Sequence, residues 1–178
     1  MHKLYNDLKS QGVTVGKDSL YAYLEHLEDA YLIFTTQIAS RSLRVRQSNP
    51  RKCYPIDPGL AAAMSFSAAE DIGHLLETLV FLELRRRGFR MHYVQTAAGH
   101  EVDFLAEHAA GERLLVQVSA RLDQAKTRKR EVRALEEAMA EHDLKRSTIV
   151  TLQHEERLTV ASGEIEMVPA WSWLLRAS

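Results

Sequence analysis

Side chains with metal-binding oxygen atoms occur in three separate segments of this chain. Glu77 lies in an apolar stretch with helical spacing, Glu101-Val102-Asp103 opens a strand-like segment, and Gln117-Val118-Ser119 ends the next one. Hard cations such as Mg²⁺ and Mn²⁺ prefer oxygen ligands, and Gln offers a neutral carbonyl oxygen. Phosphodiester hydrolysis needs such a cation to activate water and to neutralise the developing charge. We therefore take Glu77, Asp103 and Gln117 as candidate ligands of Mg²⁺ or Mn²⁺.

The order of these segments is typical of metal-dependent nucleases of the restriction-endonuclease type. Those enzymes place an acid on a helix, an acid at the start of a strand, and then the sequence acid-x-Lys. Here the third segment reads Gln-x-Ser, so Ser119 stands where the Lys is expected. Lys126 or Lys129, at the start of the following helix, can reach back to take that place. We therefore add Lys126 to the three oxygen donors as a candidate catalytic residue.

Each of these residues also has an explanation without catalysis. Glu77 can face solvent or pair with an arginine, and Glu101 and Asp103 fit the alternation of a half-exposed strand. His100, a single histidine beside a turn, is typical of a solvated surface. Gln117 is less easily explained, because a polar side chain in so apolar a strand requires a hydrogen-bond partner. The combination in this order is more specific than any single residue.

A basic segment between Ile38 and Tyr54 is a second functional candidate. It contains no acid, and its cations are Arg41, Arg44, Arg46, Arg51 and Lys52. Such a cluster suits contacts with the phosphates of DNA. The preceding helix, from Asp18 to Tyr31, carries Glu25, Glu28 and Asp29, which repel DNA. Two alternatives therefore stay open: a solvated loop, or a surface that binds protein.

The first part of the chain has the order helix, tight turn, helix and β-hairpin. Apolar residues recur at helical spacing on both sides of residues 12–16, and residues 31–38 and 52–56 have the composition of paired strands. This order is typical of a winged-helix domain. Such domains normally have three helices, so we expect residues 1–60 to form a winged-helix-like part that begins inside a domain.

Residues 60–69 are small and read as a connector, which we expect to separate the first part from a second domain over residues 70–178. There the pattern predicts a helix from Ile72 that ends before Gly88. It then predicts strands at about 90–95, 101–106 and 114–119, a helix at 123–142, and strands at 147–152 and 165–168. The strands on either side of the long helix should be parallel. The expected fold is α/β, a mixed sheet flanked by helices as in restriction endonucleases.

Composition excludes several other classes of protein. The 178 residues are 46% hydrophobic with a net charge of −1, so a contact with nucleic acid must come from a local patch. No apolar run has the length of a membrane span, and we expect no membrane partner. The one cysteine, Cys53, favours a cytoplasmic setting. No Gly-x4-Gly-Lys-Ser/Thr loop occurs, so we expect no ATP site of that kind.

Five segments together resemble the C-terminal region of a family of predicted AAA+ ATPases. They are Leu20-Tyr-x-Tyr-Leu-x-x-Leu-Glu-Asp-Ala-Tyr-Leu-Ile-Phe34, Tyr54-x-x-Asp-x-Gly59, Gly73-x-x-x-Glu77, Glu101-Val-Asp-Phe104 and Gln117-Val-Ser119. The resemblance covers nearly the whole chain and implies a winged-helix part plus a nuclease-like domain of the PD-(D/E)xK type. In that family an ATPase module precedes this region, and the acid-x-Lys motif is commonly altered.

From the residues and the resemblance together we expect a DNA-associated module that serves an ATPase and is weakly catalytic or not catalytic. A protein-interaction or regulatory module without a nucleic-acid role is the first alternative. A Mg²⁺-dependent DNA endonuclease, with Ser119 replacing the catalytic Lys, is the second.

Overall fold

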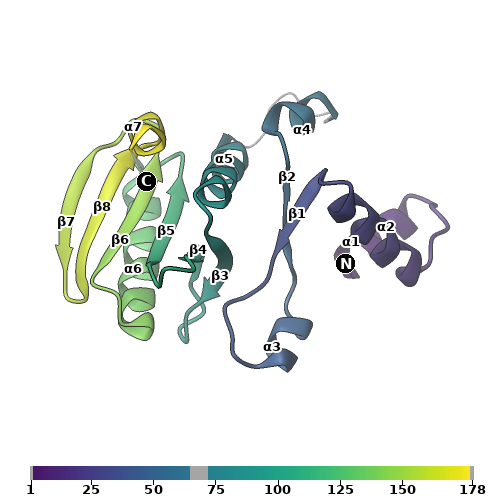
Figure 1. Cartoon of the computed structure of the whole chain (residues 1–178), viewed down its shortest axis with the longest axis horizontal. Helices are drawn as coiled ribbons and strands as arrows, with labels where there is room; N and C mark the ends of the chain where they lie inside the picture. The colour runs from purple at the N-terminus through teal and green to yellow at the C-terminus, as the bar shows by residue number, and fades with distance from the viewer. Residues whose placement is uncertain (1, 65–71, 177–178) are drawn as a thin grey trace.

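A computed structural model describes residues 2–64 and 72–176 and shows a mixed α/β protein (Figure 1). The first part of the chain contains α1 (His2–Ser10), α2 (Lys17–Asp29), β1 (Ile33–Thr36), α3 (Leu43–Ser48), β2 (Lys52–Pro55) and α4 (Pro58–Met64). The second part contains α5 (Ile72–Arg86), β3 (Arg90–Gln95), β4 (Glu101–Glu107), β5 (Arg113–Ser119), α6 (Ala125–His142), β6 (Arg146–Thr151), β7 (Glu156–Val160), β8 (Gly163–Pro169) and α7 (Ala170–Leu175).

The second part is built on a six-stranded mixed sheet with the strand order β3-β4-β5-β6-β8-β7. Strands β3, β4 and β5 form an antiparallel meander, and β5 then pairs with β6 in parallel across the crossover helix α6. The expected mixed sheet and the parallel pair around the long helix are thus confirmed. Strand β5 lies inside the sheet, and side chains on both of its faces are buried because helices cover the two faces of the sheet.

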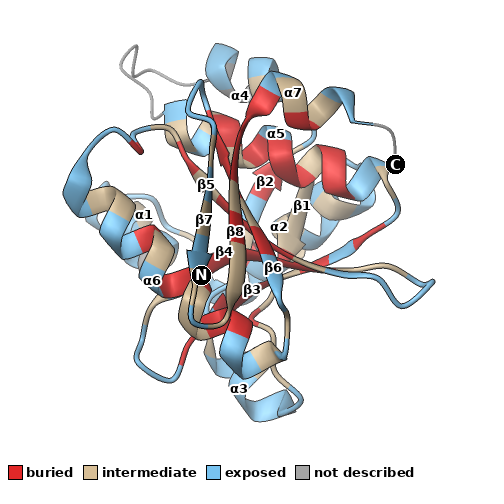
Figure 2. Ribbon diagram, turned by 90° about the vertical axis from the view of Figure 1, so that its left-hand side faces the viewer, coloured by how far each residue is buried: buried red, intermediate tan, exposed pale blue. Residues whose placement is uncertain are grey.

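Helices cover both faces of this sheet and create two hydrophobic cores. On one face α5 and α7 pack over the sheet through residues such as Val80, Phe81 and Trp173. On the other face α6 contributes Leu135 and Met139, which are fully buried. Figure 2 shows buried positions concentrated on the central strands and on α5, whereas α3 carries none. The central strands are therefore the rigid base from which polar side chains can be positioned.

The first part of the chain packs against the β3 edge of the sheet (Figure 1). Strands β1 and β2 form an antiparallel hairpin, with Thr36 opposite Lys52. Just beyond β1, the backbone N–H of Ala39 donates to the carbonyl of Tyr93, and the N–H of Tyr93 donates to the carbonyl of Gln37. The hydroxyl of Tyr93 also donates to the carbonyl of Pro50. These bonds fix the start of β2 beside the sheet.

The structure differs from the sequence-based expectations at three places. Residues 58–64 form helix α4 where a strand end and a connector were expected, and the rest of the expected connector, with the domain boundary, lies largely outside the described residues. Asp57 accepts a hydrogen bond from the N–H of Leu60, and proline suits the first helical position, which explains this helix. Helix α3 interrupts the basic segment, and strand β7 was not expected at all.

Among the described residues, no helix is both long enough and apolar enough to span a bilayer.

Candidate functional site

The candidate site lies where strands β4 and β5 separate. Their ladder runs from Glu107 opposite Arg113 to Phe104 opposite Val116 and stops there. Beyond that point side chains replace the ladder. The N–H of Asp103 donates to Oε1 of Gln117 at 3.0 Å, and the N–H of Val118 donates to Oδ2 of Asp103 at 3.0 Å. Asp103 and Gln117 are therefore fixed side by side at the point of divergence.

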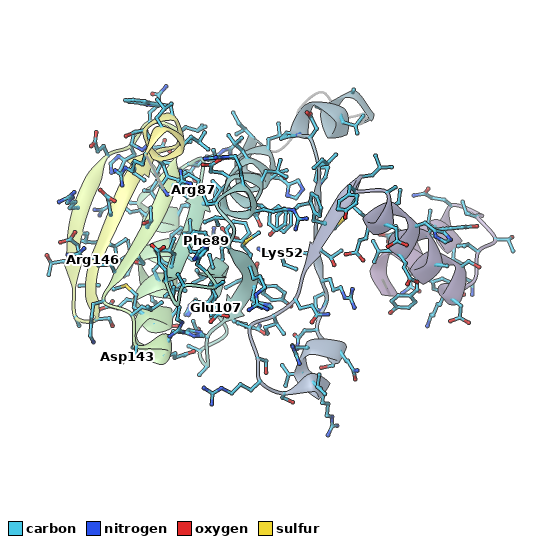
Figure 3. All side chains as sticks on the ribbon, in the orientation of Figure 1. Lys52, Arg87, Phe89, Glu107, Asp143 and Arg146 are labelled. Atoms are coloured by element: carbon cyan, nitrogen blue, oxygen red, sulfur yellow. The ribbon has the colours of Figure 1, made fainter. Side chains whose placement is uncertain are left out.

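An amine that the sequence assigned to another role reaches these residues. The Nζ atom of Lys52 lies 2.8 Å from Oδ1 of Asp103, 3.1 Å from Oε1 of Glu77 and 2.7 Å from Oε1 of Glu101. We call Lys52 and these three carboxylates the acid cluster. Figure 3 labels Lys52 between the hairpin and the sheet. The hairpin thus brings a lysine to Glu77, Glu101 and Asp103.

The alternation of strand β2 directs Lys52 inward. Side chains two positions apart share a face of a strand, and Tyr54 on that face is completely buried. Its hydroxyl donates to Oε1 of Glu77 at 2.8 Å. Its ring stacks on Phe81, with centroids 4.2 Å apart and planes within 10°. Since Glu77 and Phe81 are one turn apart on α5, one helical face holds both the tyrosine and the lysine.

Burial and charge change the ionisation of the cluster. Burial and the nearby charge of Glu77 raise the pKa of Asp103 to about 7, although the ammonium of Lys52 opposes this shift. Burial works to lower the pKa of Lys52, but the charges of Asp103 and Glu77 outweigh it and raise that pKa well above its usual range. Lys52 therefore remains an ammonium at neutral pH. Burial and the charge of Glu77 also raise the pKa of Tyr54, which keeps its proton.

A pocket of about 340 Å³ opens beside the acid cluster. It is lined by Gly99, His100, Glu101, Asp103, Gln117, Arg130, Glu131 and Ala134. His100 is half-buried here, and its Nδ1 lies 2.7 Å from Oε2 of Glu137, so it differs from the solvated residue expected from sequence. Within residues 2–64 and 72–176, no three His, Cys, Asp or Glu side chains are arranged to hold a metal ion.

Two of the three expected metal ligands lie together around one amine. Glu77 and Asp103 both contact Lys52, whereas the carbonyl oxygen of Gln117 already accepts a hydrogen bond from the backbone of Asp103. Glu101, which the sequence left outside the triad, also belongs to the cluster. Lys126 is exposed at the start of α6 and forms no ion pair with these acids in the described part of the chain.

The basic segment separates into two groups. Arg41, Arg44 and Arg51 are exposed and Arg46 is half-buried, so these arginines lie at or near the surface. Lys52 instead directs its amine into the acid cluster, and it does not belong to the exposed group. Its participation was detectable in sequence only through the alternation of Lys52 with Tyr54.

The family to which the chain belongs follows from a match over most of the sheet domain. Residues 72–173 match the model of DUF4143, described as a domain of unknown function. The chain belongs to the DUF4143 family. The matched DUF4143 region contains Glu77, Glu101, Asp103 and Gln117, whereas Lys52 precedes it. The acid cluster thus combines DUF4143 residues with a residue from outside the matched region.

Two curated proteins extend the similarity beyond the DUF4143 match. An uncharacterized protein of Methanocaldococcus jannaschii, MJ1544, is 37% identical over 183 residues, which include 97% of this chain and 40% of that protein. An uncharacterized protein of Haemophilus influenzae is 32% identical over 118 residues, 66% of this chain and 29% of that protein. The chain thus spans less than half the length of these relatives. No solved structure matches it significantly.

Proposed function

We propose that this DUF4143 chain is a nuclease-like module that acts on nucleic acid, and that its acid cluster serves the metal-dependent hydrolysis of phosphodiesters. The observation that carries this proposal is the amine of Lys52, within 3.1 Å of Glu77, Glu101 and Asp103. A restriction-endonuclease-type site requires a lysine beside its acids. The hairpin supplies one from a position that the acid-x-Lys motif does not describe.

The charge of the cluster favours a further cation. Three carboxylates surround one ammonium, so full ionisation leaves two negative charges uncompensated. The pKa of Asp103 is raised by its burial first and then by the charge of Glu77. A divalent cation in the adjacent pocket would neutralise both. Mg²⁺ commonly uses only one or two carboxylates, together with water and substrate phosphates, so a preformed cage of three acids is not required. Among the residues that line this pocket, Asp103, Glu101 and the second lone pair of the Gln117 carbonyl would be its oxygen donors, whereas Glu131 is paired with Arg130.

In such a hydrolysis, each residue of the acid cluster would have its own role. Bound Mg²⁺ or Mn²⁺ supplies an activated water and neutralises charge on the phosphate. Lys52 keeps its proton, so it donates hydrogen bonds and stabilises negative charge rather than acting as a base. Glu77 holds the Lys52 ammonium and the Tyr54 hydroxyl in place, and Asp103 orients the same ammonium from the opposite strand.

The finer assignments belong to the same proposal. We propose a restriction-endonuclease-like fold for the sheet domain and a winged-helix-like role for the first part, in which Arg41, Arg44, Arg46 and Arg51 contact DNA. The chain spans 40% of the length of MJ1544, so that relative has room for a further module such as an ATPase. Service to an AAA+ ATPase and a cytoplasmic location stay predictions from sequence.

A specific observation favours a second candidate function. Lys52 already bonds all three carboxylates, and the Gln117 carbonyl already accepts a hydrogen bond. If the Lys52 ammonium takes the place of a metal ion, the cluster is a structural clamp, that is, a set of ion pairs that holds the hairpin against the sheet. The chain would then be a non-catalytic module that docks or regulates a protein.

Cleavage of supercoiled plasmid and labelled oligonucleotides in Mn²⁺ separates the two functions. The wild-type chain should nick DNA, and Asp103→Ala and Lys52→Met should each lose that activity. No cleavage by any of the three proteins would remove the hydrolytic proposal. Equal cleavage by all three would assign the activity to another site or to a contaminant.

A further inference from the structure

Helix α6 and the loop before it carry an asymmetric distribution of charge. Residues 121–133 contain six cations, Arg121, Lys126, Arg128, Lys129, Arg130 and Arg133, against the two acids Asp123 and Glu131. The second half of the helix instead carries Glu136, Glu137 and Glu141. Since the whole chain has a net charge of −1, this is a local concentration of positive charge.

This distribution opposes the dipole of the helix. Positive side chains are unfavourable near a helix N-terminus and acids are unfavourable near its C-terminus. The first turn of α6 nevertheless contains no acid, and Gln124 at the N-cap forms no side-chain capping bond. Ion pairs with Glu156, Glu131 and Glu137 offset part of this cost at Arg128, Arg130 and Arg133. Lys126 and Lys129 have no such pair in the described part of the chain, and a charge pattern that opposes helix stability is expected at a functional surface. The cations therefore require an explanation other than helix formation.

The cations lie beside the acid cluster. Lys126, Lys129, Arg130 and Arg133 follow the spacing of one helical face, which advances by about 10 Å from the first to the last. Arg130 lines the pocket that also contains Asp103, and it stays largely exposed while Glu131 holds it. In the described part of the chain Lys126 and Lys129 form no ion pair. The face thus extends from the pocket along α6 with its charges accessible.

Ser119 lies two residues before Arg121, near the start of this face. It is only 7% exposed, and it lines a pocket of about 540 Å³ at the carboxyl ends of β5 and β6, together with Asp123, Thr151 and His154. Because its hydroxyl is open to this pocket, it can exchange hydrogen bonds with water or with a ligand.

The geometry points to a nucleic-acid-binding surface formed by Arg121, Lys126, Lys129 and Arg130, with Ser119 at its inner end. A row of cations complements a row of phosphates: from Lys126 to Arg130 the helix advances by about 6 Å, which corresponds to about two nucleotide steps of about 3.4 Å. The row leads through Arg130 to the pocket of Asp103. The strand therefore passes over α6 and presents a phosphodiester to the acid cluster. The placement of that phosphodiester rests on the proposed hydrolysis, whereas the binding surface does not.

Binding is measured by fluorescence anisotropy with a short fluorescein-labelled duplex in EDTA, so that no cleavage occurs. The variant Lys126→Ala/Lys129→Ala is compared with Lys145→Ala/Arg146→Ala, which removes the same charge at the other end of α6. Lys145 is 77% exposed, and Figure 3 labels Arg146 far from Lys52. Between about 50 and about 200 mM salt, log K falls as log salt rises, and each lost phosphate contact reduces the magnitude of this negative slope by about 0.9. The first variant should lose about 1.8 from this slope, and the second should match the wild type.

The two proposals fail separately in this design. Equal slopes for all three proteins overturn the binding surface, whether or not Mn²⁺-dependent cleavage is observed. Binding of an acidic peptide as tight as that of DNA overturns the assignment to nucleic acid. Asp103→Ala should keep DNA binding while it loses cleavage. A wild-type protein that binds through Lys126 and Lys129 but never cuts would retain the surface and remove only the hydrolysis.

Discussion

The ammonium of Lys52 lies 2.8 Å from a carboxylate oxygen of Asp103, although 51 positions separate the two residues. The contact joins the hairpin to the central strand β4, so the acid cluster is complete only when both parts of the chain are in place. Any movement of the hairpin would withdraw the amine from the carboxylates.

Replacement of Lys52 by Met should destabilise the fold. The substitution leaves Glu77 and Asp103 largely buried without their cation, and loss of one partner from a buried pair costs about 3 kcal/mol. Urea unfolding at pH 8 measures this loss, and Lys145→Met, at a site that is 77% exposed, is the matched control. Equal free energies of unfolding for the two variants would mean that the ion pairs contribute no net stability.

The free energy of unfolding should depend on pH through the titration of Asp103. Burial first, and then the charge of Glu77, raise its pKa to about 7 from 3.8, so the folded state binds its proton more tightly than the unfolded state. The free energy of unfolding should therefore fall as pH rises from about 4 to about 7 and then level off. Lys52 stays charged throughout this window, because its pKa is raised from 10.5.

Asp103→Asn should flatten that decline, since the substitution removes the titrating carboxyl. Thermal unfolding at several pH values measures the effect, and Asp29→Asn, at an exposed position of α2, serves as the control. An unchanged decline in Asp103→Asn would assign the pH dependence to other groups.

Tyr54→Phe should show how much the hydroxyl of Tyr54 contributes to stability apart from its ring. The stacking of the ring on Phe81 is kept, whereas the hydrogen bond to Glu77 is lost. Hydrogen bonds to charged groups contribute about 2 kcal/mol, so the urea midpoint should fall accordingly. Tyr21→Phe, at a residue that is 53% exposed, should leave it unchanged. A wild-type midpoint for Tyr54→Phe would show that Glu77 is held without the tyrosine.

Gln117→Glu should change metal binding and stability in opposite directions. A carboxylate beside Asp103 adds a charged oxygen ligand, and we expect Mn²⁺ affinity to rise by roughly tenfold. Without metal the same charge repels Asp103 and lowers the free energy of unfolding. Titration calorimetry and urea unfolding measure the two effects, with Gln153→Glu at an exposed position as the control. A loss of stability with no gain in affinity would argue against a metal beside Gln117.

The sheet domain was largely predictable because its local patterns are strong. Strands β3, β4 and β5 and helix α6 lie within two residues of their expected bounds, since apolar runs and helical spacing are local signals. Strand β7 was not predicted from the sequence because it is an edge strand. In such a strand half-buried residues alternate with exposed ones, and charges are common. Helix α4 was missed although Asp57-Pro58 is a good helix start.

The site was predictable only in part. Glu77 and Asp103 were recognised from their order, but the amine between them was assigned to a surface because Lys52 stands in a basic run. A contact across 51 positions depends on how the hairpin packs against β3, which no local pattern encodes. The buried Tyr54 two residues later was the one local indication of its direction.

Calorimetric titration of Mn²⁺ at pH 8 distinguishes a metal site at the acid cluster from an internal ion pair. If the acid cluster is a metal site assisted by Lys52, the wild-type protein binds Mn²⁺, Asp103→Asn loses that binding, and Lys52→Met binds Mn²⁺ more tightly because a competing charge is gone. If Lys52 instead takes the place of the metal, the wild-type protein gives no binding heat and only Lys52→Met binds. That second result would contradict the hydrolytic account and leave the cluster as a clamp between the hairpin and the sheet.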